Sequence, residues 1–174
     1  LSRLREAHLD WVKRTRDTGL IAEPIILTRE KAIGHRYGIL RQSDDATFSS
    51  RLADIAVQAS EGPKALPKLL KAMKDPDAAI RYWGAVGIGN IGQSAKSAAK
   101  QMRAALKDES AVVRIAAARA LCRLDMPKAA LTVLARELDR GEQWERLHAA
   151  IVLDQIDEMA RPVIAEMHAQ LKPR

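Results

Sequence analysis

Residues 75–92, DPDAAIRYWGAVGIGNIG, return one period later as residues 108–125, DESAVVRIAAARALCRLD, and a third time, more altered, as residues 140–157, RGEQWERLHAAIVLDQID. An arginine brings the copies into register at steps of 33 and 32 residues (114 minus 81, 146 minus 114): Arg81, Arg114 and Arg146. Large apolar residues then coincide as well: Ile88, Leu121 and Leu153. Self-similarity at such a period, with helical spacing inside each copy, predicts an α-solenoid whose units bury their apolar faces against one another.

The predicted fold class is all-α, an α-α superhelix of paired antiparallel helices, A and then B in each unit. A composition with only 3% aromatic residues suits closely packed helices better than a sheet. Apolar spacing places the units and their helices: residues 63–92 with helices 63–74 and 76–91, residues 94–125 with helices 94–107 and 110–124, residues 127–157 with helices 127–138 and 142–156, and a terminal helix over 160–171. Asp75 and Ser94 are predicted N-caps. Residues 1–62 are expected to form an atypical cap of helices and an irregular connection within the same continuous domain.

The charge balance of the chain bounds the class of partner. Its 174 residues carry 29 Lys and Arg against 22 Asp and Glu, a net charge of +7. An acidic partner, including a polyanion, is permitted but not indicated, because the basic residues are spread along the chain and mostly alternate with acids. No apolar run reaches the roughly 20 residues that a membrane-spanning helix requires. The start at Leu1 rather than Met leads us to expect processing or a longer parent protein.

One surface of the predicted B helices carries the candidate contact residues. Counted from the register arginine, offsets +2, +5 and +9 lie opposite the core stripe and would line the concave side of a solenoid. Six polar or aromatic residues stand at these offsets: Trp83, Asn90, Arg119, Arg123, His148 and Gln155. An exposed Trp83 beside two arginines would suit a carboxylate, sulfate or phosphate group. The alternative is that Trp83 packs against a neighbouring helix and that the arginines are solvated.

We find no motif for a catalytic residue, a cofactor or a metal. Cys122, the single cysteine, lies inside a predicted helix and excludes an intramolecular disulfide. The four histidines are isolated from one another: His8, His35, His148 and His168. The glycines of residues 84–92 follow no predicted strand, so close helix packing explains them better than phosphate binding does.

Small residues in helix B, an aspartate before it and an arginine in its first turn resemble the HEAT-repeat family, especially its short bacterial members. In that family the aspartate and the arginine are structural. The resemblance therefore implies a ladder, formed by Asp75 with Arg81 and by Asp108 with Arg114, that would tie turns to neighbouring helices. In the third copy Arg140 stands where the aspartate belongs, so the ladder is expected to be weaker there.

Four longer stretches carry a more specific resemblance: DWVKRTRDTGLIAEP (10–24), IRYWGAVGIGNIG (80–92), VRIAAARALCRLD (113–125) and ERLHAAIVLDQIDEMARPVI (145–164). In this order they are similar to the C-terminal extension of certain bacterial sulfatases, enzymes that remove sulfate from sulfated glycans. The resemblance implies a non-catalytic region that follows an α/β catalytic domain in an exported or periplasmic protein. Cys122 does not match the family's active-site motif, a Cys or Ser followed by x-Pro-x-Arg.

The first hypothesis is a non-catalytic HEAT-repeat structural or protein-interaction module, whose partner is an upstream catalytic domain or another chain. The second is a free-standing HEAT adaptor that uses its concave face on an acidic protein. The third is a HEAT-like DNA-binding protein or DNA glycosylase. A base-excising site needs a carboxylate in an aromatic-lined basic groove, and only Trp83 with Arg119 and Arg123 comes near that requirement.

Overall fold

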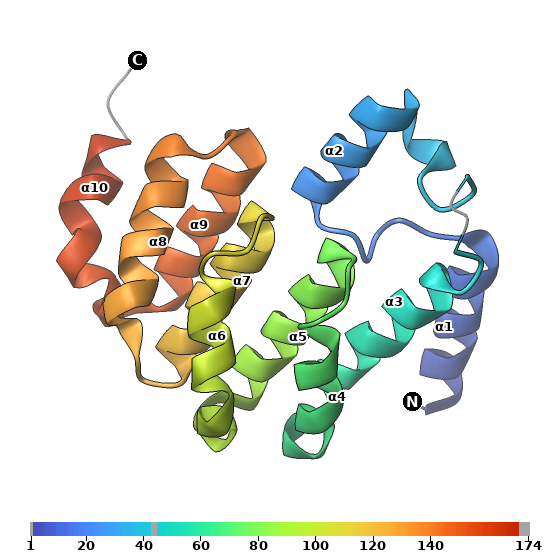
Figure 1. Cartoon of the computed structure of the whole chain (residues 1–174), viewed down its shortest axis with the longest axis horizontal. Helices are drawn as coiled ribbons and strands as arrows, with labels where there is room; N and C mark the ends of the chain where they lie inside the picture. Colours follow the sequence, from blue (N-terminus) through green and yellow to red (C-terminus); the bar gives the residue numbers. More distant parts are fainter. Residues whose placement is uncertain (1, 43–44, 171–174) are drawn as a thin grey trace.

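The described part of the chain is helical throughout. The computed structural model describes residues 2–42 and 45–170 and contains no β-strand within them, which confirms the all-α prediction (Figure 1). Four segments precede the repeats: α1 (Ser2–Thr15), α2 (Glu23–Ile33), the 3₁₀ helix η1 (Arg36–Gly38) and α3 (Phe48–Gln58). The repeats then follow: η2 (Gly62–Ala65) and α4 (Leu66–Ala72) with α5 (Ala78–Ile91), η3 (Gly92–Ala98) and α6 (Ala99–Ala105) with α7 (Ala111–Arg123), α8 (Pro127–Arg140) with α9 (Gln143–Gln155), and η4 (Asp157–Val163) with α10 (Ile164–Ala169). Residue 171, the predicted end of the terminal helix, lies outside the described residues.

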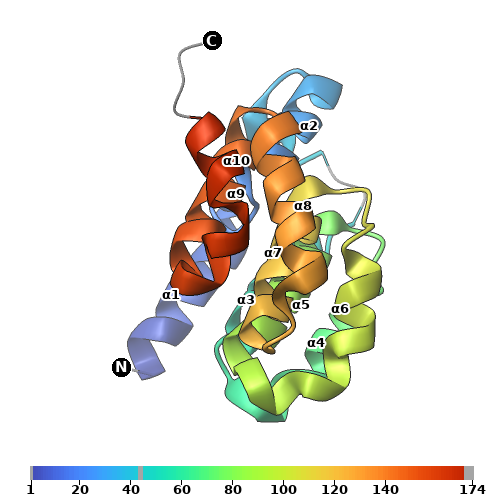
Figure 2. The same cartoon turned by 90° about the vertical axis from the view of Figure 1, so that its left-hand side faces the viewer.

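The paired helices stack into one array. We call α4, α6, α8 and α10 the A helices and α5, α7 and α9 the B helices; Figure 2 shows α4, α6 and α8 along one side of the molecule. Helix α5 packs against α4 of its own unit and against α3 and α7 of the adjacent units, and α7 packs against α5, α6, α8 and α9. The residues predicted to form the apolar spine of the stack, Ile88, Leu121 and Leu153, are fully buried. The array is therefore an α-solenoid with a shared core.

Glycines in α5 set how closely its neighbours approach. A Cβ atom added at Gly87 would lie 2.5 Å from Cδ2 of Leu69 in α4 and 2.9 Å from Cα of Ala59 at the end of α3. A Cβ atom at Gly89 would lie 3.2 Å from Cα of Ala120 in α7. Helices α3 and α7 thus lie on opposite sides of α5, and both approach it at distances that only small residues permit.

Three of the predicted A helices begin differently from the prediction. The structure opens the first and second units and the terminal helix with the 3₁₀ helices η2, η3 and η4, so α-helices that start at residues 63, 94 and 160 are wrong. Ser94 is not an N-cap, since it lies inside η3. The backbone of Ala95 is not helical and kinks η3, and both Ala95 and Ala98 are buried in the core.

The cap of α5 also differs from the prediction. The helix begins at Ala78 rather than at residue 76, and its N-cap is Asp77, whose Oδ1 accepts a hydrogen bond of 2.8 Å from the backbone N–H of Ala79. Asp75 instead accepts from the backbone N–H of Asp77 at 2.9 Å, which makes a turn ahead of the helix. Because Asp75 precedes Pro76, its backbone is disfavoured in the helical region.

The N-terminal segments pack on the array. Helix α1 contacts α3, and α2 contacts both α7 and α9. Residues of α2 share a cavity with the first residues of α5, α7 and α9, so α2 lies across the N-terminal ends of the B helices, with Ile25 and Ile26 buried. None of the helices in the described ranges is long and apolar enough to cross a membrane.

Candidate functional site

The register arginines connect each unit to the next one. Arg81 donates from Nε and Nη2 to the two carboxylate oxygens of Asp108, at 2.8 and 2.9 Å, and from Nη1 to the backbone carbonyls of Asp75 and Pro76, at 3.0 and 2.8 Å. The guanidinium of Arg81 thus contacts the turn before α5 through backbone carbonyls and the turn before α7 through a bidentate pair. Hydrogen bonding to Asp108 raises the pKa of Arg81 above its ordinary value, because the charged form is favoured.

The same arrangement recurs on both sides of Arg81. Arg51 of α3 donates to the carboxylate of Asp75 at 2.6 Å, and Arg114 of α7 makes a bidentate pair with Glu137 at 2.8 and 2.9 Å. Arg81 contacts Asp75, and Arg114 contacts Asp108, through the backbone carbonyls at 3.0 and 2.9 Å, whereas the carboxylate of each aspartate accepts from the arginine of the unit before it. The weaker tie expected at the third unit is not observed, because Glu137 supplies the carboxylate that Arg140 does not.

Glu137 is a buried carboxylate with two arginine partners. Besides Arg114, Arg136 donates to its Oε1 at 2.5 Å. Burial alone would raise the pKa of Glu137, but the hydrogen bonds from Arg114 and Arg136 outweigh it, and the pKa lies below its ordinary value. Glu137 is therefore ionised at neutral pH and fixes α7 to the end of α8.

Three of the six candidate contact residues come together on the B helices. Arg119 of α7 donates from Nη1 to Oδ1 of Asn90 at 3.2 Å and from Nε to Oε1 of Gln155 at 3.0 Å. The amide of Asn90 in turn donates to the carbonyl oxygen of Ala59, at 3.1 Å. This polar chain crosses from the end of α3 over α5 and α7 to α9. Its hydrogen-bonding groups hold one another, which makes it a tie between helices.

The other three candidates lie apart from this chain. Trp83 is half-buried, and its indole N–H donates to the carbonyl oxygen of Leu20 at 2.7 Å. The prediction that Trp83 is exposed is therefore wrong, because the connection between α1 and α2 covers part of its side chain. Arg123 is exposed at the end of α7, and His148 is half-buried in α9, where desolvation lowers its pKa.

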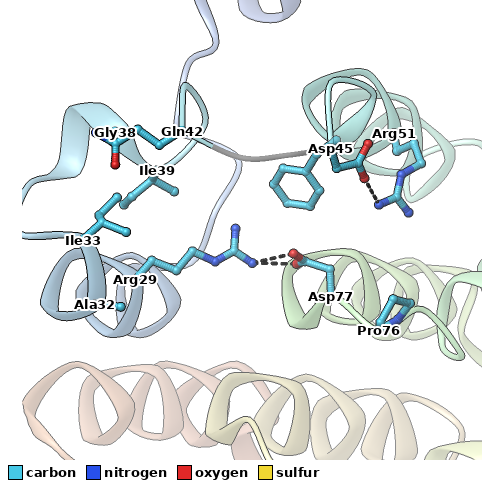
Figure 3. A pocket seen from close by; sticks show the side chains of 11 residues that line it. Arg29, Ala32, Ile33, Gly38, Ile39, Gln42, Asp45, Arg51, Pro76 and Asp77 are labelled. Carbon is cyan, nitrogen blue, oxygen red and sulfur yellow. Dashed lines mark hydrogen bonds and ion pairs between the residues drawn. The ribbon is translucent and has the colours of Figure 1, made fainter.

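A cavity that the sequence did not indicate lies between α2, η1 and the start of α3 (Figure 3). It has a volume of about 480 Å³, and its charged groups are already paired. Arg29 donates to both carboxylate oxygens of Asp77 at 2.7 Å, and Arg51 bridges Asp45 at 2.7 Å and Asp75 at 2.6 Å. Hydrogen bonds from Thr47 and Arg51 lower the pKa of Asp45 to about 2. The cavity therefore lies where α2, α3 and the first repeat meet, and its ion pairs hold these elements together.

Cation–π contacts also stabilise the packing of α2 and α3 around this cavity. The guanidinium carbons of Arg29 and Arg51 lie 5.1 and 5.9 Å from the centroid of the buried Phe48 ring. The spacing from Asp45 to Arg51 is six residues, the same as from Asp75 to Arg81. This repeated spacing is the signal that could have identified α3 as one more helix of the B type.

The exposed sides of α4 and α6 are basic, and Lys128 at the start of α8 lines the same cavity as Arg103, together with the exposed carboxylate of Asp125. Residues 62–74 and 92–107 contain no Asp or Glu. We define the basic A face by nine exposed residues: Lys64, Lys68, Lys71, Lys74, Lys96, Lys100, Arg103, Lys107 and Lys128. Lys64 pairs with Glu61 at 2.5 Å, and Arg103 contacts the sulfur of Met126. The expectation that basic residues alternate with acids is wrong for these helices.

Comparison with known families agrees with the fold. A family model described as HEAT repeats matches residues 66–154, which is 89 residues (154 minus 66, plus 1) and just over half of the chain. The chain belongs to the HEAT-repeat family. No curated protein and no solved structure matches it. Within the described ranges, no group of three or more His, Cys, Asp or Glu side chains is arranged to hold a metal ion.

Proposed function

We propose that this chain is a non-catalytic HEAT-repeat module that binds an acidic protein surface through its basic A face. The observation that carries the proposal is the acid-free exposed side of α4 and α6, continued by Lys128 at the start of α8. Within residues 2–42 and 45–170, Lys64 alone among the residues of the basic A face forms an ion pair, with Glu61, whereas Arg81 and Arg114 are paired with carboxylates. A contiguous field of one sign attracts a complementary surface and accelerates association, and the attraction decreases with salt.

The sulfatase resemblance indicates what kind of protein the partner is. We propose that it is the catalytic domain of a sulfatase-type hydrolase, for which this chain is a non-catalytic extension. Two of the four stretches that carry the resemblance meet in the fold: Leu20, from residues 10–24, accepts the indole hydrogen bond of Trp83, from residues 80–92. These two stretches therefore pack together, as expected of parts of one extension.

The test compares two triple charge reversals with the same net charge change. One places glutamate on the basic A face, at Lys71, Lys100 and Lys107. The control places it at exposed basic residues elsewhere, at Arg3, Arg14 and Lys31. Binding is measured to poly-L-glutamate and to a sulfatase-type catalytic domain produced without its own extension. We expect the face variant to bind at least about tenfold more weakly than the control. Equal loss in both variants, or turnover of an aryl sulfate by the wild-type chain, contradicts the proposal.

Duplex nucleic acid is the second candidate partner. Eight of the nine residues of the basic A face are lysines, and none is aromatic, a composition that suits phosphate backbones better than bases or single strands. A 20-base-pair duplex tested in parallel distinguishes the two candidates. If the duplex binds more tightly than poly-L-glutamate and its affinity falls steeply as salt increases, the partner is a nucleic acid.

A further inference from the structure

The repeat register shows which side of a B helix meets the next one. Gly89 stands eight residues after the register arginine of α5, and a Cβ atom there would lie 3.2 Å from Cα of Ala120 and 3.1 Å from Nη1 of Arg119, both in α7. Positions one, four, five and eight residues after the register arginine share one helical face. This face of a B helix is therefore its stacking face toward the following unit.

The stacking face is covered in α7 and open in α9. In α7 it consists of Ile115, Ala118, Arg119 and Cys122, all buried or half-buried. The equivalent residues of α9 are Leu147, Ala150, Ile151 and Asp154. Ile115 is 2% exposed, whereas Leu147 and Ile151 are each 46% exposed. No B helix follows α9 within the described residues, so two large apolar side chains remain in water.

Helix α10 also has an apolar residue that no B helix covers. The A helices can be aligned on the residue that accepts a hydrogen bond from the arginine of the preceding unit. These residues are Asp75, Asp108, Glu137 and Gln170. Six residues earlier stand four large apolar residues, which are 0%, 0%, 6% and 49% exposed in turn: Leu69, Met102, Leu131 and Ile164. Leu69 lies against Gly84 and Gly87 of α5, its own B helix. Ile164 therefore lacks the B helix that would cover it.

We propose that α9 and α10 form the seat of one further B-type helix, and that a partner polypeptide supplies this helix. By the repeat register, the stacking face of α9 and Ile164 of α10 both border the position that the next B helix of the array would take. Arg146 of α9 already donates a hydrogen bond of 2.6 Å to Gln170, just after α10. The interface would continue the one that joins α5 to α7 and α7 to α9 within the array.

The covered interfaces define the chemistry of the incoming helix. It must be amphipathic, with a small residue where α7 has Ala120 and large apolar residues where α7 has Leu121 and Leu124. An arginine at the position of Arg119 would face Asp154, because Arg119 lies beside the equivalent Gly89. A second copy of this chain does not present such a stripe, since Ala120, Leu121 and Leu124 are buried in its own core. The occupant that we propose is therefore an amphipathic helix of a partner protein that carries this pattern.

A synthetic peptide with the sequence of residues 110–125 and serine in place of Cys122 is the probe. Its binding to the whole chain is followed by fluorescence anisotropy, and its folding by circular dichroism. We expect saturable binding with a gain in helicity, weakened at least about tenfold by Ile151→Glu or Leu147→Glu in the chain. The matched control is Leu4→Glu, at an exposed leucine of α1, which leaves the affinity unchanged.

Further controls separate the proposal from its rivals. A peptide with Trp in place of Ala120 should not bind, and one with Glu in place of Arg119 should bind more weakly. Because Leu147 and Ile151 are exposed, their substitution leaves the thermal unfolding midpoint of the chain nearly unchanged. The proposal is overturned if the peptide does not bind, if Leu4→Glu weakens it as much as Ile151→Glu, or if sedimentation shows a dimer of the chain that Ile151→Glu dissociates.

Discussion

Arg81 in α5 makes a bidentate pair with the carboxylate of Asp108, 27 residues further along the chain, and so fixes the first unit to the turn of the second. The same guanidinium holds the carbonyls of Asp75 and Pro76 in its own unit. Both side chains of the pair are nearly buried. Each unit thus depends on its neighbour for a polar tie as well as for apolar contact.

Replacing Arg81 should destabilise the chain strongly. Arg81→Met leaves the Asp108 carboxylate without its bidentate partner and two carbonyls without a donor. We expect the free energy of unfolding in urea to fall by about 3 kcal/mol. Arg140→Met is the matched control, because Arg140 is exposed and its contact with Asp139 is 3.7 Å long; it should change the free energy by less than about 0.5 kcal/mol. Equal effects of the two substitutions would show that the tie is not structural.

Gly87→Ala tests the packing of α5 by the sign of its effect. Helix propensity alone predicts that alanine stabilises α5 by about 1 kcal/mol. The added Cβ, however, would lie 2.9 Å from backbone Cα of Ala59 and 2.5 Å from Leu69. We therefore expect net destabilisation of about 1–3 kcal/mol, measured by urea unfolding. A gain in stability would mean that the helices approach each other less closely.

Stability should fall in acid through Glu137. Its folded-state pKa is lowered, so the stability that it contributes is present above its unfolded pKa and is lost as pH falls through the folded pKa. Glu137→Gln should remove that part of the pH dependence, so its stability and that of the wild type should converge as the solution becomes acidic. Glu166→Gln, at an exposed residue of α10, serves as the control. The measurement is the free energy of unfolding in urea from neutral to acidic pH. A constant difference between wild type and Glu137→Gln across this range would refute the assignment.

Cys122 should be inert in the folded protein. Its side chain is fully buried, and desolvation raises its thiol pKa to about 11. We expect reaction with a disulfide reagent such as DTNB at pH 8 to occur only through unfolding, and to become fast in urea. Rapid modification in buffer would indicate that α7 is accessible.

The repeat register and the B helices could be predicted from sequence alone. The predicted B helices over 76–91, 110–124 and 142–156 agree with α5, α7 and α9 to within two residues at each end. Their apolar positions recur at nearly the same period, because each unit packs against a similar neighbour. The apolar positions within each copy therefore indicate which side of its B helix is buried.

The ties between units could not be predicted in the same way. Asp75 and Arg81 recur six residues apart in each complete copy, and this spacing does not reveal that the guanidinium reaches the carboxylate of the following unit. The covering of Trp83 by Leu20 depends on a connection outside the repeats. Residues 62–74 and 92–107 carry the sequence signal of the basic A face, because they contain no Asp or Glu, whereas the net charge of +7 does not locate it on the chain.

A double-mutant cycle of Arg81→Met and Asp108→Asn is the most direct test of the stacked array, because it measures a contact that exists only if α5 lies against the turn of the following unit. The free energies of unfolding of the wild type, the two single variants and the double variant give the coupling between the side chains. The structure predicts a coupling of about 1–3 kcal/mol. A coupling indistinguishable from zero, with the two substitutions simply additive, would contradict the account.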